Sequence, residues 1–188
     1  MLKQIEGSLG VAEAVALCRP EIICAYPISP QTHIVENLGA MVKKGTLENC
    51  EFLNVESEFA AMSVAIGGSV AGGRAYTATA SQGLLLMIPN LYKIAGEQLP
   101  GVFNVSARAL ASHALSIFGD HSDIYACRQT GCAMLCESSV QEVMDLTPVA
   151  HLASIKGKIP FINFFDGFRT SHEIQKIEKW DYEDLKEM

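Results

Sequence analysis

The chain has 188 residues, of which 49% are hydrophobic and 19% charged, and it carries a formal net charge of −7. This length suits one domain with a sizeable core, and the acidic balance argues against a nucleic-acid partner, because nucleic-acid binders carry a basic footprint. No run reaches the roughly 18 uncharged apolar residues of a membrane helix, and the first ten residues lack the apolar stretch of a signal peptide. The sequence therefore predicts a cytoplasmic protein without a membrane partner.

Helices and strands are expected to alternate from residue 9 onward, with Ser8 as the cap of the first helix. The expected helices are Leu9–Cys18, a segment from about Thr32 to about Lys44, Ser57–Ala71, Leu84–Gln98 and Ser138–Ile155. The expected strands are Glu21–Tyr26, Glu51–Val55, Arg74–Thr79, Gly101–Ser106, Cys132–Cys136 and Ile159–Phe165. This alternation predicts an α/β fold, a doubly wound, mostly parallel sheet of about six strands with helices on both faces. We expect the charged stretch Glu173–Met188 to be peripheral.

Most of the six cysteines fall inside expected helices and strands, and no two of them form a Cys-x-x-Cys pair. Cys127, Cys132 and Cys136 lie close together in the chain, but their spacing matches no standard metal site. We therefore expect thiols of the core or the near surface in a reducing compartment.

Glu58 lies in the first turn of a helix whose following residues are almost all small or apolar. One interpretation is a helix-start signal. The other is an acid in a closed site, because the carboxyl edge of an open α/β sheet binds ligands and a helix that is apolar nearly all round is buried. The lack of polar residues downstream favours the second interpretation, so we expect Glu58 to point away from water.

Two other segments also follow strands. Pro27 and Pro30 bracket Ser29 in a stiff turn, which either holds a hydroxyl or backbone group against a ligand or is a plain loop in which Ser29 caps a helix. Arg108 follows the strand Gly101–Ser106, and its planar guanidinium suits either a carboxylate ligand or a structural salt bridge. The sequence pattern leaves both alternatives open.

The segment Ala109–Gly131 has no clear period. It contains four residues of metal-ligating types, His113, Asp120, His121 and Asp123, but their irregular spacing brings them to no common face. We favour an ordered loop over the mouth of the site and keep a metal site as the minor alternative. The sequence has neither a G-x-G-x-x-G motif after a strand nor a G-x-x-x-x-G-K-[ST] motif. Because these glycine-rich loops bind phosphates, we expect no phosphate-binding loop in this chain.

Five stretches together resemble one family: Tyr26–Thr32, Val55–Met62, Thr79–Phe103, Ser106–Gly131 and Pro160–Glu178. They are similar to the pyrimidine-binding domain of the 2-oxoacid:ferredoxin oxidoreductases, and most similar to the α subunits of the pyruvate:ferredoxin oxidoreductases (pyruvate synthases). The resemblance runs from about Gly7 to Glu178, with Ser29 where the family often has Thr. It implies one pyrimidine-binding domain over residues 1–178 and a charged tail over residues 179–188.

The resemblance implies oxidative decarboxylation of pyruvate with coenzyme A to acetyl-CoA and CO2, or the reverse, with electrons passed to ferredoxin. Thiamine diphosphate would be shared with a partner chain. Glu58 would be catalytic and would bind the aminopyrimidine, together with Pro27. Ser29 and Arg108 would contact the 2-oxoacid, and no residue of this chain would ligate a metal.

Partner chains are expected to hold Mg²⁺, the diphosphate and the 4Fe-4S clusters, because the Gly-Asp-Gly motif that the family uses for Mg²⁺ and the diphosphate is missing here. The expected partners are thus a diphosphate-binding subunit, a cluster-carrying subunit and ferredoxin. The alternatives are another 2-oxoacid:ferredoxin oxidoreductase, a non-oxidative thiamine-dependent decarboxylase and a non-catalytic assembly module.

Overall fold

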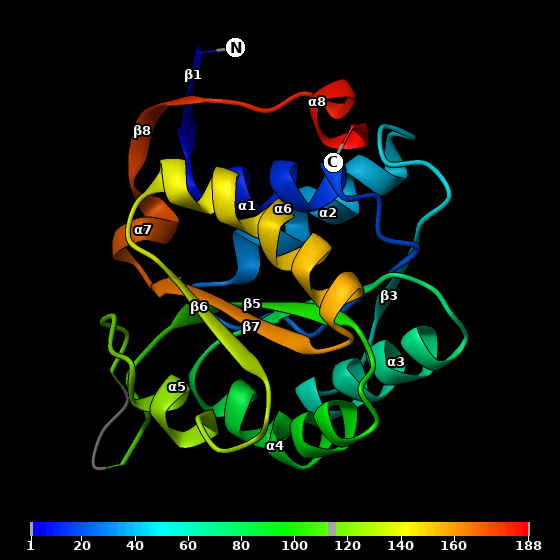
Figure 1. Cartoon of the computed structure of the whole chain (residues 1–188). Coiled ribbons are helices and arrows are strands. Elements are labelled where there is room, and N and C mark those ends of the chain that lie inside the picture. The colour runs from blue at the N-terminus through cyan, green and yellow to red at the C-terminus, as the bar shows by residue number, and fades with distance from the viewer. Residues whose placement is uncertain (1, 113–115, 188) are drawn as a thin grey trace.

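A sheet of six parallel strands forms the centre of the computed structural model, which describes residues 2–112 and 116–187 (Figure 1). Across the sheet the strands are β3 (Glu51–Asn54), β2 (Ile22–Ala25), β4 (Ala75–Thr79), β5 (Gly101–Ala107), β7 (Pro160–Asp166) and β6 (Ala133–Glu137). Every residue of β4 and β5 is buried, as expected for central strands that are covered on both faces. The prediction of an α/β fold with a parallel sheet of about six strands is confirmed.

Helices cover both faces of this sheet (Figure 1). One face carries α1 (Gly7–Leu17), α2 (Thr32–Lys43) and α6 (Val140–Gly157), and the other carries α3 (Glu58–Val70), α4 (Ser81–Gly96) and α5 (Ser122–Cys127). Tyr76 and Phe165 belong to the core under the first group, whereas Phe103 and Ile162 belong to the core under the second. The alternation of side chains along each strand thus divides the apolar residues between two cores.

The strand order places a switch point between β2 and β4. From β2 the chain proceeds to β3 on one side, and from β4 it proceeds to β5 on the other side. In open α/β sheets, ligands bind at such a point, outside the carboxyl ends of the strands. The segments that follow β2, β4 and β5 therefore frame the candidate site.

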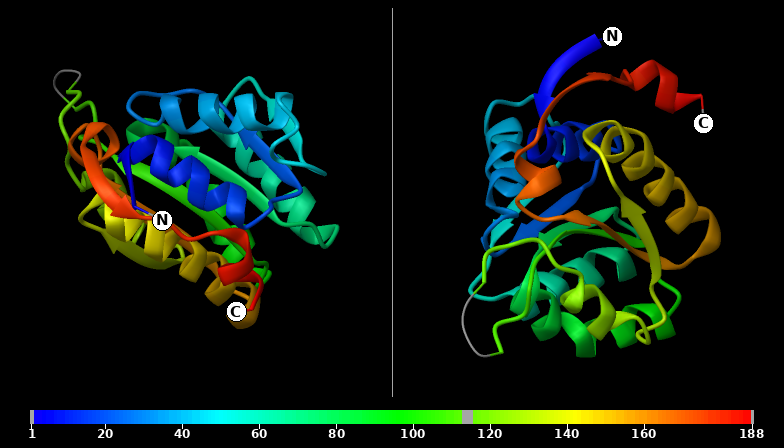
Figure 2. Two further views of the ribbon diagram at one scale, coloured as in Figure 1. Left: turned by 90° about the horizontal axis from the view of Figure 1, so that it is seen from above. Right: turned by 90° about the vertical axis from the view of Figure 1, so that its left-hand side faces the viewer.

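A second, two-stranded sheet joins the two ends of the chain. β1 (Leu2–Glu6) pairs antiparallel with β8 (Ile174–Glu178), which follows the short helix α7 (Arg169–His172) (Figure 2). The sequence analysis missed this pairing and wrongly made Ser8 the cap of the first helix. α1 already begins at Gly7, and the Ser8 hydroxyl donates a hydrogen bond of 2.9 Å to the Ser171 carbonyl.

The last described residues pack back onto the domain. Trp180 Nε1 donates to Asp145 Oδ1 at 3.1 Å, and the Arg19 guanidinium lies 3.4 Å above the ring of Tyr182 in α8 (Tyr182–Lys186). The charged stretch is thus peripheral, but it is held to α6 and to the end of α1.

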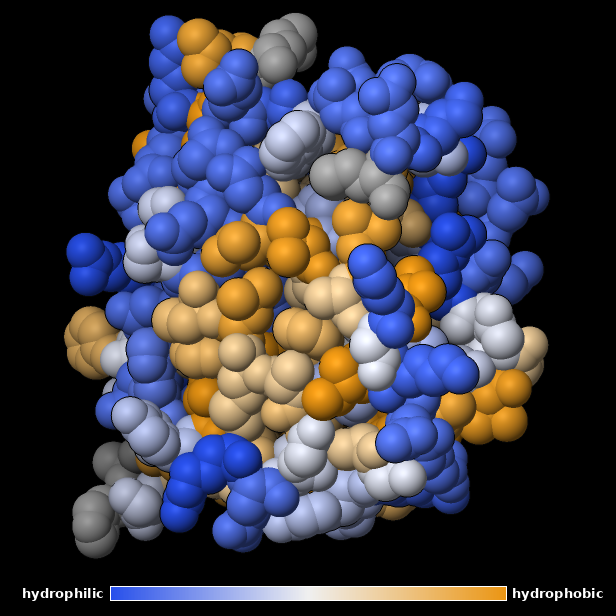
Figure 3. All heavy atoms as spheres, in the orientation of Figure 1, coloured by the Kyte–Doolittle hydropathy of each residue, from blue (hydrophilic) through white to orange (hydrophobic). Residues whose placement is uncertain are grey.

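The expectation that the helix of Glu58 is buried all round is wrong. One side of α3 packs on the sheet and on α4, while Phe59 is 43% exposed and Val70 63% exposed on its outer side. Figure 3 shows a second apolar area over α6 and β6, where Val149, Leu152 and Ile155 are exposed.

The cysteines are free thiols, as expected. Cys24 and Cys127 are buried, Cys136 is exposed, and Cys18, Cys50 and Cys132 are partly buried. Among the described residues, no helix is both long and apolar enough to cross a membrane.

Candidate active site

Glu58 is buried at the point where α3 begins. Ser57 caps the helix, since its hydroxyl accepts a hydrogen bond of 3.1 Å from the Ala60 N–H. The Glu58 residue is only 8% exposed, and within the described part of the chain its carboxyl group has no hydrogen bond or ion pair. Because no described residue pairs with it, this carboxyl group is available to a bound molecule.

The Glu58 carboxyl group packs against Gly83, in the first turn of α4, where a larger residue would leave no space for it. A Cβ atom on Gly83 would lie 2.6 Å from Glu58 Oε1 and 2.5 Å from Thr79 Oγ1. Thr79 Oγ1 is also buried, and it has no hydrogen-bond partner in the part of the chain that the structure describes. An acid and a hydroxyl thus converge beside the amino end of α4, where the helix dipole favours negative charge.

Arg108 and Ser29 lie in contact, although β2 and β5 are not adjacent strands. Arg108 Nη1 donates to the Ser29 carbonyl oxygen at 2.8 Å, and Nε donates to the Ser116 carbonyl oxygen at 3.0 Å. Arg108 is only 7% exposed, and its fork of five N–H donors retains hydrogens beyond these two bonds. The sequence analysis assigned both residues to one ligand, and the structure brings them together. The alternative in which Arg108 serves an ion pair finds no acidic partner among the described residues.

The turn after β2 is anchored by Gln31 rather than by Ser29. Gln31 Nε2 donates to the Ala78 carbonyl oxygen at 2.6 Å, and Gln31 also occupies the N-cap position of α2. The alternative in which Ser29 caps the helix is therefore wrong. Ser29 and Pro27 are both exposed at this edge, where they are accessible to a ligand.

Asp123 ties the ends of β4 and β5 together. Its Oδ2 atom accepts hydrogen bonds from the Ser81 N–H at 2.8 Å and the Arg108 N–H at 3.1 Å, while Oδ1 accepts from the Ile124 N–H at 2.8 Å. Burial raises the pKa of Asp123, and the three N–H donors act in the opposite direction. Sequence reasoning missed this role, because an Asp in an irregular segment gives no sign of which backbone groups it contacts.

The metal alternative for this loop finds no support in the described residues. Asp123 is occupied by three backbone groups, and the His121 ring lies edge-on against Phe164 with 5.5 Å between centroids. His113 lies outside the described residues. The part of the loop that is described does lie at the site, because Ser116 contacts Arg108.

Sequence reasoning also missed Gly83 and Thr79. A glycine in the first turn of a helix that directly follows a buried strand often marks a place where another group packs closely against the backbone. This signal could have identified Gly83 as the residue against which the Glu58 side chain packs.

A family model described as "Pyruvate flavodoxin/ferredoxin oxidoreductase, thiamine diP-bdg" matches residues 13–188. The chain belongs to this family. It is a thiamine-diphosphate-binding domain of the pyruvate oxidoreductases, as the resemblance implied, and the non-oxidative decarboxylase is not favoured.

Similar proteins agree with this assignment. The chain is 54% identical to a pyruvate-flavodoxin oxidoreductase of Klebsiella pneumoniae, over 98% of the chain and 16% of that protein. It is 52% identical to a pyruvate:ferredoxin oxidoreductase of Moorella thermoacetica, over 100% of the chain and 16% of that protein. The chain thus spans about a sixth of the length of these relatives.

A solved structure shares the fold. The 2-oxoglutarate:ferredoxin oxidoreductase of Magnetococcus marinus superposes with a TM-score of 0.87 at 23% identity, over 97% of this chain and 32% of that chain. In each of these comparisons the chain matches only part of a longer oxidoreductase chain.

Proposed function

We propose that this chain forms the pyrimidine side of the thiamine diphosphate site in a pyruvate:ferredoxin oxidoreductase. The reaction converts pyruvate and coenzyme A to acetyl-CoA and CO2, with release of one proton and two electrons. The observation that carries the proposal is Glu58, a buried residue whose carboxyl group has no hydrogen-bond partner among the described residues, in a domain whose family binds this cofactor. High identity to pyruvate oxidoreductases over the whole chain supports pyruvate as the substrate.

The residues at this edge fit an aminopyrimidine. A flat ring with a basic nitrogen suits a buried carboxyl group, because each supplies the hydrogen-bond partner that the other lacks. The buried Thr79 hydroxyl, which no described residue pairs with, offers a second polar contact. Pro27 presents an exposed apolar ring from the turn after β2, and we assign it to the cofactor as well.

Glu58 has the catalytic role. When bound, thiamine diphosphate supplies a nucleophilic carbon and an electron sink. Glu58 would hold the aminopyrimidine by sharing a proton with a ring nitrogen, and this contact would help the cofactor to form that nucleophilic carbon. Burial keeps water from competing for the Glu58 carboxyl group.

Arg108 and Ser29 bind the 2-oxoacid in this proposal. The remaining N–H donors of Arg108 hold the substrate carboxylate, and the Ser29 hydroxyl donates to a substrate oxygen. The hydrogen bond between Arg108 and the Ser29 carbonyl fixes the two groups relative to each other. Such positioning lowers the entropic part of the barrier.

The rest of the enzyme lies on partner chains or domains. We assign the diphosphate and Mg²⁺ to one partner and the 4Fe-4S clusters to another. The electrons pass to ferredoxin, and we place the complex in the cytoplasm. The outer side of α3 and α4 supports a docking partner near Glu58, since Phe59, Leu86 and Tyr92 are all more than 40% exposed there, and exposed apolar patches mark interaction sites. The domain is taken as residues 1–178 and the tail as residues 179–188.

The test is Glu58→Gln in the assembled enzyme, with pyruvate-dependent reduction of a viologen dye as the readout. We expect kcat to fall at least about 100-fold, with a much smaller change in the affinity for thiamine diphosphate. Glu56→Gln is the matched control, because Glu56 lies two residues earlier and is exposed. Survival of turnover in Glu58→Gln would refute the proton-sharing role, and faster turnover with 2-oxoglutarate than with pyruvate would assign a different substrate.

A further inference from the structure

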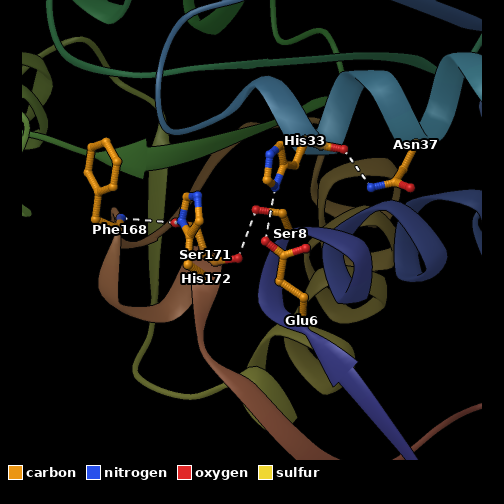
Figure 4. A network of polar contacts seen from close by, with 7 residues as sticks. All are labelled: Glu6, Ser8, His33, Asn37, Phe168, Ser171 and His172. Atoms are coloured by element: carbon orange, nitrogen blue, oxygen red, sulfur yellow. Dashed lines mark hydrogen bonds and ion pairs between the residues drawn. The ribbon is translucent and has the colours of Figure 1, made fainter.

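Three side chains with metal-binding groups meet where β1, α2 and α7 come together. Glu6, His33 and His172 place one ligand atom each within 4.8 Å of one another (Figure 4). Glu6 Oε1 lies 3.0 Å from His33 Nδ1, and the two imidazole rings have centroids 5.2 Å apart. In the part of the chain that the structure describes, no other group of three or more His, Cys, Asp or Glu residues meets this criterion.

The backbone fixes the relative positions of Glu6 and His172. Glu6 ends β1 and pairs with Ile174 of β8, directly beyond α7. The Gly7 N–H donates to the Glu173 carbonyl at 3.0 Å, and a Cβ atom on Gly7 would collide with the Thr170 carbonyl oxygen. The carboxylate and the imidazole thus come from two segments that are locked together by hydrogen bonds and close packing.

His172 is oriented by its own neighbours. Ser171 Oγ lies 2.7 Å from His172 Nδ1 and also accepts a hydrogen bond of 2.9 Å from the Phe168 N–H. The Phe168 ring stacks on the imidazole, with 5.4 Å between centroids and 12° between planes. In the tautomer in which Nδ1–H donates to this hydroxyl, Nε2 has no proton and is open to an ion. Metal-ligating histidines usually donate their other ring N–H to a neighbouring group in this way.

The ligand set has a definite chemistry. Two imidazoles and one carboxylate suit Zn²⁺ and similar ions, often with a coordination position left to water. Ca²⁺ and Mg²⁺ prefer sites made of oxygen atoms only. Ligand atoms around a tetrahedral Zn²⁺ lie roughly 3.3 Å apart, as follows from bonds of about 2.0–2.1 Å. His33 and His172 are exposed, so small rotations of their side chains can bring the ligand atoms to this spacing without disturbing the core.

We propose that Glu6, His33 and His172 form a binding site for a divalent first-row transition-metal ion, with Zn²⁺ as the probe. The bound ion links β1, α2 and α7 and thereby fastens the two ends of the chain to the sheet domain. Because the ion binds the folded chain and not the unfolded one, it raises the melting temperature. The site is separate from Glu58 and does not depend on the proposed oxidoreductase function.

The experiment uses the full chain after removal of metal with a chelator. Zn²⁺ is titrated in competition with a chromophoric indicator, and thermal unfolding is followed with and without Zn²⁺. At a hundredfold excess of Zn²⁺ over Kd we expect the melting temperature to rise by about 5 °C or more. His33→Gln, His172→Gln and Glu6→Gln should each weaken Zn²⁺ binding at least about 10-fold. His121→Gln is the matched control and should bind Zn²⁺ like the wild type.

Co²⁺ distinguishes this site from the thiols. A complex with histidine and carboxylate ligands shows only visible ligand-field absorption, whereas a cysteine complex adds a thiolate charge-transfer band in the near ultraviolet. Circular dichroism of the metal-free variants verifies that they are folded. The proposal is overturned if the wild type shows no stoichiometric binding, if His33→Gln and His172→Gln bind as tightly as the wild type, or if the thiolate band accompanies binding.

Discussion

Arg108 Nη1 donates a hydrogen bond of 2.8 Å to the carbonyl oxygen of Ser29. The two residues follow β5 and β2, which are separated in the sheet by β4. The Arg108 side chain therefore reaches across the end of β4, over the switch point of the sheet. This contact sets the distance between the two groups that we assign to the 2-oxoacid.

Arg108→Ala should raise the KM for pyruvate in the assembled enzyme. A hydrogen bond between charged groups contributes about 1.5–3 kcal/mol, so kcat/KM should fall by about 10- to 150-fold. Steady-state kinetics over a range of pyruvate concentrations measures the effect. Arg128→Ala is the control, since Arg128 lies on an exposed surface and donates to Tyr125 of its own helix. An unchanged KM in Arg108→Ala would leave Arg108 with a structural role only.

Gly83→Ala should displace the Glu58 carboxyl group. The added Cβ would lie 2.6 Å from Glu58 Oε1, and such overpacking typically costs about 1–3 kcal/mol of unfolding free energy. Urea denaturation measures this loss, and turnover of the assembled enzyme should fall as well. The matched control is Gly67→Ala in α3, where a Cβ meets nothing within 4 Å; this change should be neutral or stabilise the helix by up to about 1 kcal/mol. Equal stability of the two variants would refute the close approach.

Asp123→Asn should loosen the ends of β4 and β5. In either orientation of the amide, its NH2 group replaces a carboxylate oxygen that accepts from a backbone N–H, so at least one hydrogen bond is lost. We therefore expect the unfolding free energy to fall by about 1–3 kcal/mol. Because the Arg108 backbone is one of the donors, the KM for pyruvate should also rise, which a merely structural residue would not cause. Asp120→Asn is the control, an exposed acid whose Oδ1 accepts from the Ser122 N–H, and it should lose about 1 kcal/mol or less.

Glu137 should make the stability of the chain depend on pH. It is 1% exposed, and its Oε1 atom accepts from Asn163 Nδ2 at 2.9 Å and from Thr147 Oγ1 at 3.3 Å. Burial raises the pKa of Glu137 well above its ordinary value. The folded state therefore keeps a proton that the unfolded state has lost, so unfolding free energy falls as pH rises above about 4.3, by up to about 1.4 kcal/mol per pH unit.

Glu137→Gln removes this titration and keeps an oxygen for Asn163 and Thr147. The decline of unfolding free energy between about pH 5 and 8 should be smaller in this variant. Urea denaturation at several pH values measures the slope. Glu36→Gln, a change at an exposed position of α2, should leave the slope as in the wild type. The same slope in Glu137→Gln and the wild type would show that Glu137 is ionised in the folded chain.

The regular part of the fold could be predicted because its signals are local. A buried strand is a continuous apolar run and an amphipathic helix has a period of 3.6 residues, so the six strands of the central sheet and five of the helices on it were found within a few residues. The short helix α5 was missed, because its segment has no clear period. The position of Glu58 follows from the same logic, since the start of a helix after a strand lies at the carboxyl edge of the sheet. The sequence by itself thus determined the fold class and the family resemblance, and it predicted the acid that we place at the centre of the proposed site.

Contacts between distant segments were decided only by the tertiary structure. The pairing of β1 with β8 joins the two ends of the chain, and neither strand shows its partner in its own residues. The bond from Arg108 to Ser29, the three hydrogen bonds of Asp123 and the meeting of Glu6 with two histidines depend on the order of strands in the sheet. The exposure of the outer side of α3 could not be predicted either, because the sequence of an apolar helix does not reveal whether its own chain or another polypeptide covers it.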